Sequence, residues 1–275
     1  IGETSTIIVS FNQPMVSLQK FPEGEGTGPL LIRPRVSGKY RWMGTRTLVF
    51  LPERGRLPYG TNFTVTVPRG ISSISGQVLK VDFSWSLETP RPKLISHWPR
   101  DKSQWINLNE VVILQFNQKM PLEETRDFLE LTGRGSEGTK TFLPFQVRYL
   151  TQEEIREQRL RAKEGEILLL KPEGKFRPGY FYEVKVLKGL PGVEGPLGMS
   201  KDYEFNFSTY GLFRFLRIEK PHLSSPEDSM VLNFSNPVSY REVATHISFQ
   251  PEIEIPEYYY GSDYSNSRIY LWLNL

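Results

Sequence analysis

The stretch TIIVSFNQPM at residues 6–15 decides the fold, because closely related stretches occur twice more in the chain. They are VVILQFNQKMP at residues 111–121 and MVLNFSNPV at residues 230–238. Each has an apolar run that ends in Phe, followed by a polar pair and a nearby Pro. The runs are rich in β-branched residues and short for a helix, which predicts buried strands. Pro has no N–H to donate, so we expect each ladder to stop there.

The spacing of these stretches predicts three units of one kind. Phe11 and Phe116 are 105 residues apart, and Phe116 and Phe234 are 118 apart, which suits Ig-sized domains of about 100 residues. Further segments recur in the same order, among them residues 82–89 and 202–209 at an offset of 120. We therefore predict an all-β chain of tandem Ig-like β-sandwich domains at residues 1–90, 91–210 and 211–275.

Two of these units are expected to be incomplete. Phe234 is followed by 41 residues, the same number that separates Phe11 from Pro52, so the third unit would lack its last hairpin. The first unit has no counterpart of the lead-in segment at residues 93–96 and would lack its first strand. We expect the sequence to be a window of a longer protein whose sheet edges are otherwise covered.

Two local patterns give specific expectations. Residues 81–89 alternate, so Val81, Phe83, Trp85 and Leu87 should face the core. The second unit carries a polar insertion at residues 151–165, which begins with a capping box and ends at a Gly. This pattern predicts a short helix, either solvated over a sandwich edge or docking a partner.

Composition excludes several classes of function. The chain has no Cys, which rules out disulfides and thiolate chemistry, and its net charge of +3 is too small to indicate a nucleic-acid surface. No apolar run approaches a membrane span. The three histidines, His97, His222 and His246, have no metal-ligand spacing. We predict no enzyme activity, no catalytic residues, no cofactor and no metal site.

Two other features have more than one interpretation. Acidic residues near the unit boundaries would suit calcium, although they form no D-x-D-x-D loop; they are Asp101, Glu110, Glu227 and Asp228. Aromatic residues gather in a second cluster, which either forms a partner-binding patch or belongs to the core and rim of a strand pair. This cluster contains Tyr258, Tyr259, Tyr260 and Tyr264.

The strand ending in F-N-Q-P-M or F-N-Q-K-M, the L-x-F-x-P strand, the P-x-G turn and the closing F-x-T strand resemble bacterial Ig-like domains. They look most like those in the N-terminal region of bacterial α2-macroglobulin-like proteins. The resemblance covers the first two units almost fully and the third partly. It implies a non-enzymatic structural arm of a broad-spectrum protease-trapping inhibitor, whose thioester cannot lie in a chain without Cys.

The resemblance also implies partners and a location. The partners would be the remaining domains of the same longer chain and, through them, target proteases, with a membrane reached only through an anchor elsewhere. The location would be the periplasm or the bacterial cell envelope, with the signal peptide outside this segment. The alternative is an Ig-like adhesive or ligand-binding module of a bacterial surface protein. Prolines at residues 90–92 favour a stiff first connection.

Overall fold

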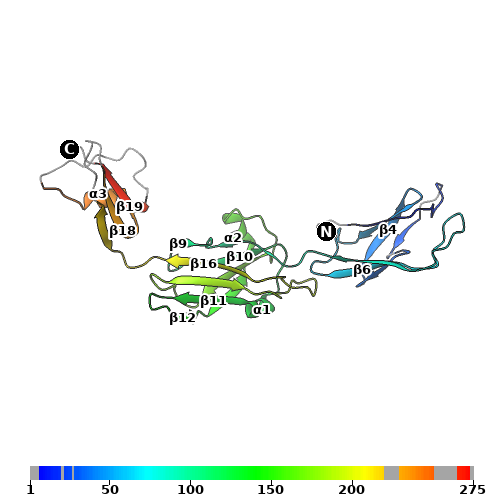
Figure 1. Ribbon diagram of the computed structural model, residues 1–275, viewed down its shortest axis with the longest axis horizontal. Helices are drawn as coiled ribbons and strands as arrows, with labels where there is room; N and C mark the ends of the chain where they lie inside the picture. Colours follow the sequence, from blue (N-terminus) through cyan, green and yellow to red (C-terminus); the bar gives the residue numbers. More distant parts are fainter. Residues whose placement is uncertain (1–5, 20–21, 27, 220–228, 251–264, 273–275) are drawn as a thin grey trace.

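The protein is an all-β chain of packed sheets in which every described strand pair except the parallel pair β9–β16 is antiparallel. A computed structural model describes all residues except 1–5, 20–21, 27, 220–228, 251–264 and 273–275. Its strands form five sheets, which Figure 1 shows as three successive groups along the chain. We refer to these groups as the first unit (β1–β7), the second unit (β8–β16) and the third unit (β17–β19). The all-β sandwich fold predicted from the sequence is confirmed.

The first unit packs a four-stranded sheet, ordered β1-β5-β4-β2, against a three-stranded sheet, ordered β3-β6-β7. Its core contains Leu48 and Phe50 from one sheet and Phe63 and Val65 from the other. The strand bounds are β1 Ile7–Ser10, β2 Glu23–Glu25, β3 Leu31–Arg33, β4 Gly38–Met43, β5 Thr47–Pro52, β6 Asn62–Val67 and β7 Phe83–Glu88.

The second unit has the same plan with two more strands at its edges. One sheet is ordered β13-β14-β10-β8 and the other β12-β11-β15-β16-β9. The strand bounds are β8 Leu94–Trp98, β9 Ser103–Ile106, β10 Val112–Phe116, β11 Leu129–Arg134, β12 Lys140–Phe142, β13 Phe145–Tyr149, β14 Ile167–Pro172, β15 Phe181–Val186 and β16 Tyr203–Thr209. The signature strand β10 lies between β14 and β8, and its Phe116 is fully buried.

The third unit has one described sheet, ordered β17-β18-β19, and one helix. Its elements are β17 Phe215–Glu219, β18 Ser229–Ser239, α3 Tyr240–Thr245 and β19 Ser265–Trp272. The strand β18 extends past Pro237, whereas we expected the polar pair and Pro to end it. Its pairing with β19 is broken between Asn233 and Val238, so the Pro lies where the ladder is irregular and needs no N–H.

The predicted helical insertion is present but shorter than expected. Helix α2 covers Gln152–Glu157 and begins with the predicted capping box, in which Thr151 Oγ1 accepts from the Glu154 N–H at 3.2 Å. It ends at Glu157, eight residues before Gly165, which instead adopts φ +81° just before β14. Ile155 is buried against Leu169 on the outer face of that sheet, as the interpretation of a helix over the sandwich requires.

The structure differs from the sequence-based expectations in two further respects, the burial of residues near β7 and the presence of short helices. In the alternating strand β7, Trp85 and Leu87 pack against the core, but Val81 and Phe83 are 69% and 63% exposed. The prediction that these two are buried is wrong: Val81 lies before the strand, and Phe83 is the first residue of β7, which is an edge strand. Two short helical segments were not predicted from the sequence: α3, and α1 (Leu122–Thr125) with the 3-10 turn Arg126–Phe128.

A large-to-small change in the second unit should separate core from surface. We expect Phe116→Ala to lower the free energy of unfolding by about 3–5 kcal/mol, because a buried ring is replaced by a cavity. Phe142→Ala is the matched control, since Phe142 is 68% exposed, and it should cost about 0.5 kcal/mol or less. Urea unfolding followed by tryptophan fluorescence measures both. Equal losses in the two variants would contradict the described core.

Candidate functional site: the joints between the units

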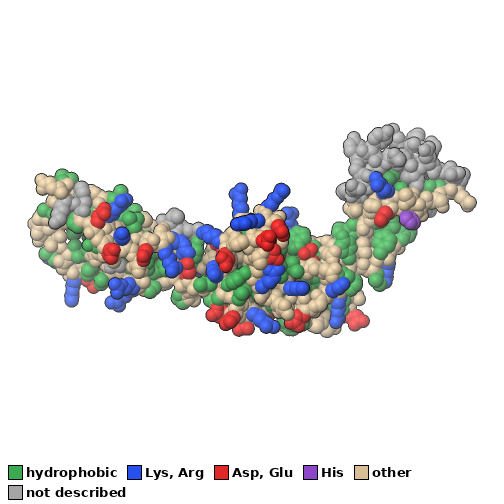
Figure 2. All heavy atoms as spheres, turned by 180° about the vertical axis from the view of Figure 1, so that it is seen from behind, with side chains coloured by type: hydrophobic (Ala, Val, Ile, Leu, Met, Phe, Trp, Pro, Cys, Tyr) green, Lys and Arg blue, Asp and Glu red, His purple; other side chains and the backbone are tan. Residues whose placement is uncertain are grey.

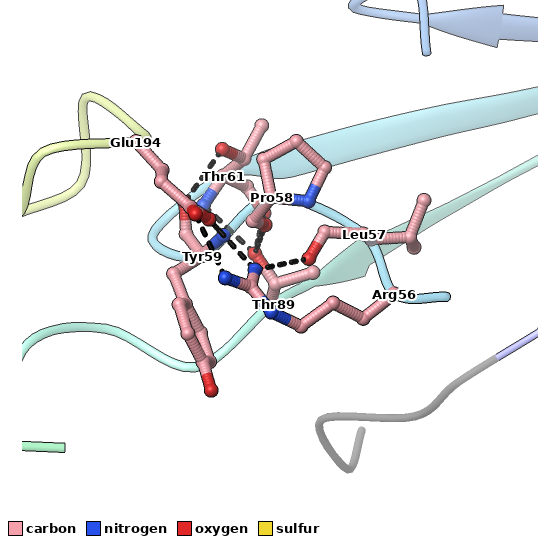
Figure 3. A network of polar contacts seen from close by, with 7 residues as sticks. All are labelled: Arg56, Leu57, Pro58, Tyr59, Thr61, Thr89 and Glu194. Atoms are coloured by element: carbon pink, nitrogen blue, oxygen red, sulfur yellow. Dashed lines mark hydrogen bonds and ion pairs between the residues drawn. The ribbon is translucent and has the colours of Figure 1, made fainter. Parts of the chain in front are cut away.

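The most densely bonded polar site of the described chain lies where the first unit meets the second. The connection between β5 and β6 contributes Arg56, Tyr59 and Gly60, and the loop between β15 and β16 contributes Glu194 and Leu197. Figure 3 shows the Glu194 side chain reaching from its loop to the Arg56 guanidinium. Residues 138 positions apart are thereby joined.

The centre of this joint is a bidentate ion pair between Arg56 and Glu194. Arg56 Nη1 and Nη2 each donate to one Glu194 carboxylate oxygen at 2.7 Å (Figure 3). Glu194 Oε2 also accepts from the Tyr59 N–H at 2.9 Å, and the guanidinium lies 4.0 Å from the centroid of the Tyr59 ring. Both charged side chains are less than a third exposed, so solvent screens them less than a surface pair.

The charge arrangement sets the protonation of Glu194. The Arg56 hydrogen bonds lower the pKa of Glu194 below its ordinary value of 4.5, against partial burial, which raises it. A carboxylate whose pKa is lower in the folded state stabilises that state above its ordinary pKa. The stabilisation from Glu194 is therefore complete at neutral pH and is lost as the pH falls through the lowered value.

Backbone groups of the two units also meet directly at this joint. The Leu197 N–H donates to the Gly60 carbonyl at 2.7 Å. A Cβ at Gly60 would lie 2.8 Å from the Leu197 carbonyl oxygen, and one at Gly195 would lie 2.2 Å from the Tyr59 carbonyl oxygen. Gly60 also has φ +56°, which favours Gly. The close approach of the two loops thus requires Gly at positions 60 and 195.

The connecting backbone is fastened by the residue that follows the signature Phe. Asn117 Oδ1 accepts from the Lys93 N–H at 2.8 Å, and its Nδ2 donates to the Arg91 carbonyl at 3.0 Å. The Gly60 N–H donates to the Pro90 carbonyl at 2.8 Å, which holds the other end of the same connection. These bonds satisfy polar groups of the connecting backbone and fix its path into β8.

Ser235, at the position that matches Asn117, binds the connection between the second and third units in the same way. Ser235 Oγ accepts from the Arg214 N–H and donates to the Leu212 carbonyl, both at 2.8 Å. Asn236 binds the N–H and the carbonyl of Gly211 with its side-chain amide, at 3.2 and 2.8 Å. The polar pair of the signature is therefore a fastener for the preceding connection as well as the end of a strand.

One side chain crosses directly from the second unit to the third. Trp105 Nε1 donates to the Ser235 carbonyl at 3.2 Å. Trp105 itself has φ +56°, a backbone conformation that is uncommon for a bulky residue. The second joint thus depends on fewer direct contacts among the described residues than the first, where an ion pair, the Tyr59 N–H bond to Glu194 and one backbone–backbone hydrogen bond cross.

The singled-out residues whose structure is described make packing contacts and hydrogen bonds to the backbone. His97 is half-buried, stacks on Phe205 with ring centroids 3.7 Å apart and lies with Nδ1 2.8 Å from the Pro99 carbonyl, so it packs within the sandwich. His246 Nδ1 lies 2.8 Å from the Glu242 carbonyl at the end of α3. Asp101 accepts from the Asn206 N–H at 3.0 Å. Among the residues described here, no three His, Cys, Asp or Glu side chains are grouped to hold a metal ion.

Several candidates fall on parts of the chain for which no structure is described. His222, Glu227 and Asp228 lie in residues 220–228, and the tyrosine cluster, Tyr258, Tyr259, Tyr260 and Tyr264, lies in residues 251–264. The interpretations of the tyrosines therefore stay predictions. Within the described ranges, none of the helices is long and apolar enough to cross a membrane.

The joint residues were not singled out from the sequence. The segment LPYG at residues 57–60 was interpreted only as a turn, and Glu194 was one acidic residue in a Gly-rich loop, PGVEGPLG at residues 191–198. The available signal was the pair of Gly residues that surround Glu194 at a place where no hairpin turn requires two. Such residues indicate close approach of another backbone.

Comparison with known proteins gives distant similarities. No protein-family model matches the chain. It is 21% identical over 276 aligned positions to an alpha-2-macroglobulin homolog of Nostoc sp., covering 91% of this chain and 14% of that protein. It is 24% identical over 218 residues to Circularly permutated Ras protein 2 of Dictyostelium discoideum, covering 76% of this chain and 5% of that protein. The chain thus spans a small part of the length of either relative. The β-sandwich fold and the first similarity indicate a macroglobulin-like module.

Removing the cation of the first joint should loosen it without unfolding either unit. We expect Arg56→Ala to raise hydrogen-exchange rates at the Tyr59 and Leu197 amides by about tenfold or more, since a charged hydrogen-bonded pair contributes about 1.5–3 kcal/mol. Arg91→Ala is the control, because its pair with Glu88 is more exposed and lies within one short segment. Unchanged exchange in Arg56→Ala would contradict a joint held by this pair.

The fastening of the first connection can be tested at one amide. Asn117→Ala removes the acceptor of the Lys93 N–H, so we expect exchange at Lys93 to become at least about fivefold faster, as a lost hydrogen bond is worth about 1 kcal/mol. Asn109→Ala, with an exposed loop side chain, should leave Lys93 unchanged. Amide exchange followed by NMR measures both variants. Protection of Lys93 that survives Asn117→Ala would show that the side chain does not hold the connection.

Proposed function

We propose that this chain is a non-enzymatic structural arm of a bacterial macroglobulin-like, broad-spectrum protease-trapping inhibitor. The observation that carries the proposal is the first joint, where the Arg56–Glu194 pair and the Leu197–Gly60 hydrogen bond fix one β-sandwich against the next. An arm must hold other parts at a set distance, and fastened joints supply that property. The similarity to the alpha-2-macroglobulin homolog over 91% of this chain supports the same assignment.

The proposed partners and location follow from this role. The chain acts through the remaining domains of a longer polypeptide, which contact the target proteases, and it works in the periplasm or cell envelope. Its own polar side chains bind the connections between units and link neighbouring strands. Asn117 accepts from the Lys93 N–H, and Lys185 Nζ on β15 lies 3.1 Å from Glu204 Oε2 on β16. Neither use needs a reactive group. The trapping chemistry belongs to other parts of the inhibitor.

The role can be tested with distance measurements between spin labels. The chain has no Cys, so Lys39→Cys and Glu157→Cys introduce unique labelling sites on exposed positions of the first and second units. We expect one narrow distance distribution, which should broaden in the Arg56→Ala background and stay narrow in the Arg91→Ala background. A broad distribution in the labelled parent chain would contradict a rigid arm.

The alternative role as an adhesive module predicts a different result. An arm should show no saturable binding on a glycan array and should not by itself slow a panel of proteases. Saturable glycan binding by this chain would favour the adhesive module, and stoichiometric inhibition by this chain alone would place trapping chemistry where the proposal excludes it.

A further inference from the structure

The three described strands of the third unit match three of the four strands of one sheet of the second unit. In the second unit β10 pairs antiparallel with β8 and β14, and in the third unit β18 pairs antiparallel with β17 and β19. Leu114 lies opposite Leu168, and Leu232 lies opposite Ile269. A short helix follows the signature strand in both cases, α1 after β10 and α3 after β18. The matched sheets therefore present the same inner face.

In the second unit this inner face is covered completely. Val112, Leu114 and Phe116 of β10 are all 0% exposed. They share one core cluster with residues of the hairpin β15–β16, including Tyr182 and Phe205. At the edge strand β8, Leu94 is 4% exposed and His97 stacks on Phe205. A hairpin with alternating apolar residues is thus what closes this kind of sheet.

In the third unit the β17 side of the matched face is exposed, whereas Leu232 and Ile269 at its centre are each 3% exposed. Phe215 lies opposite Phe234, as Leu94 lies opposite Phe116, but Phe215 is 53% exposed. Ile218 lies opposite Leu232, as His97 lies opposite Leu114, and Ile218 is 50% exposed. This face borders a groove of about 810 Å³, lined on the sheet side by Phe213, Phe215, Ile218, Met230, Leu232 and Phe234 and on the other side by α3 and the segment that follows it. Figure 2 shows apolar side chains gathered on the visible side of this unit.

An apolar surface of this kind is costly in water and marks a binding face. The groove follows the inner face of an antiparallel sheet, and such faces are covered in sandwiches by a second sheet packed about 10 Å away. Its polar lining is confined to α3 and the segment that follows it, at Glu242, His246 and Ser248. These features fit an extended apolar occupant and not a charged one.

We propose that this groove is the docking face for a β-hairpin of the β15–β16 type, supplied by the same polypeptide as the third unit. In both sandwiches described here, the strand matched to β19 leads directly into the hairpin: β5 ends at Pro52 and β6 begins at Asn62, and β14 ends at Pro172 and β15 begins at Phe181. Because the connection from such a strand to the hairpin is short, a hairpin of the same polypeptide has a high effective concentration at the groove. The inference rests on these matched contacts and is independent of the protease-trapping role.

The test compares the 275-residue chain with two extended chains. The extensions join residues 173–209 or residues 53–89 after Leu275, so that each supplies a connection and a hairpin that closes such a face elsewhere in this protein. The probe is the apolar dye anilinonaphthalene sulfonate, read by fluorescence, and the oligomeric state is read by light scattering. We expect the 275-residue chain to bind the dye as a monomer and at least one extended monomer to lose that binding.

A pair of variants in one strand locates the dye. Ile218→Glu places a charge in the groove and should weaken dye binding to the 275-residue chain about tenfold, from the loss of one apolar contact surface. Leu216→Glu is the matched control, because Leu216 is 58% exposed in the same strand and does not line the groove. It should leave dye binding unchanged.

Three results would overturn the proposal. Dye binding that is equally strong in the parent chain and in Ile218→Glu would show that the dye does not bind this groove in solution. Dye binding that persists in both extended chains would show that such a hairpin does not close it. A dimer of the 275-residue chain that Ile218→Glu disperses would assign the face to a second copy.

Discussion

The structure depends on one constraint, which is that the apolar inner face of each sheet must be covered by a second layer. A strand that alternates between apolar and polar residues has one face that water disfavours, and an isolated sheet cannot hide it. In the second unit, Phe116 on one sheet and Phe205 on the other are buried to within 1%. This pairing of faces explains the sandwich, the buried aromatic residues and the short connections between strands of opposite sheets.

The joints follow from a second requirement, which concerns backbone polar groups. A connection that runs between two packed bodies loses contact with water, so its N–H and carbonyl groups need partners. Asn117 and Ser235 supply them at the two joints, and each does so immediately after the Phe that anchors its sheet. The position of the sheet and the path of the preceding connection are thereby fixed together. The Arg56–Glu194 pair adds charge to the first joint, where Gly60 and Gly195 allow the backbones to meet.

Periodicity and internal similarity predicted the fold because they report on burial within one sandwich. They placed β10, β16 and the capped start of α2 from local residues alone. The same reasoning failed at Val81 and Phe83, because alternation states which face a residue occupies and not whether a neighbour covers it there. It could not find the Arg56–Glu194 pair, because those residues meet only when two folded units are in place. A candidate site made by a joint is invisible to patterns read along a single strand.

Covering faces and fastening connections make neighbouring units interdependent. The loop whose Glu194 binds Arg56 belongs to the second unit, and β8, which closes one edge of the second unit, begins four residues beyond Pro90. A contact that orients one sandwich is therefore also part of the folded structure of the next. In such a chain a displacement of one sandwich strains the loops of its neighbour, whereas beads on flexible linkers would move independently. The proposed role as a rigid arm uses this coupling, in which each unit completes part of the fold of its neighbour.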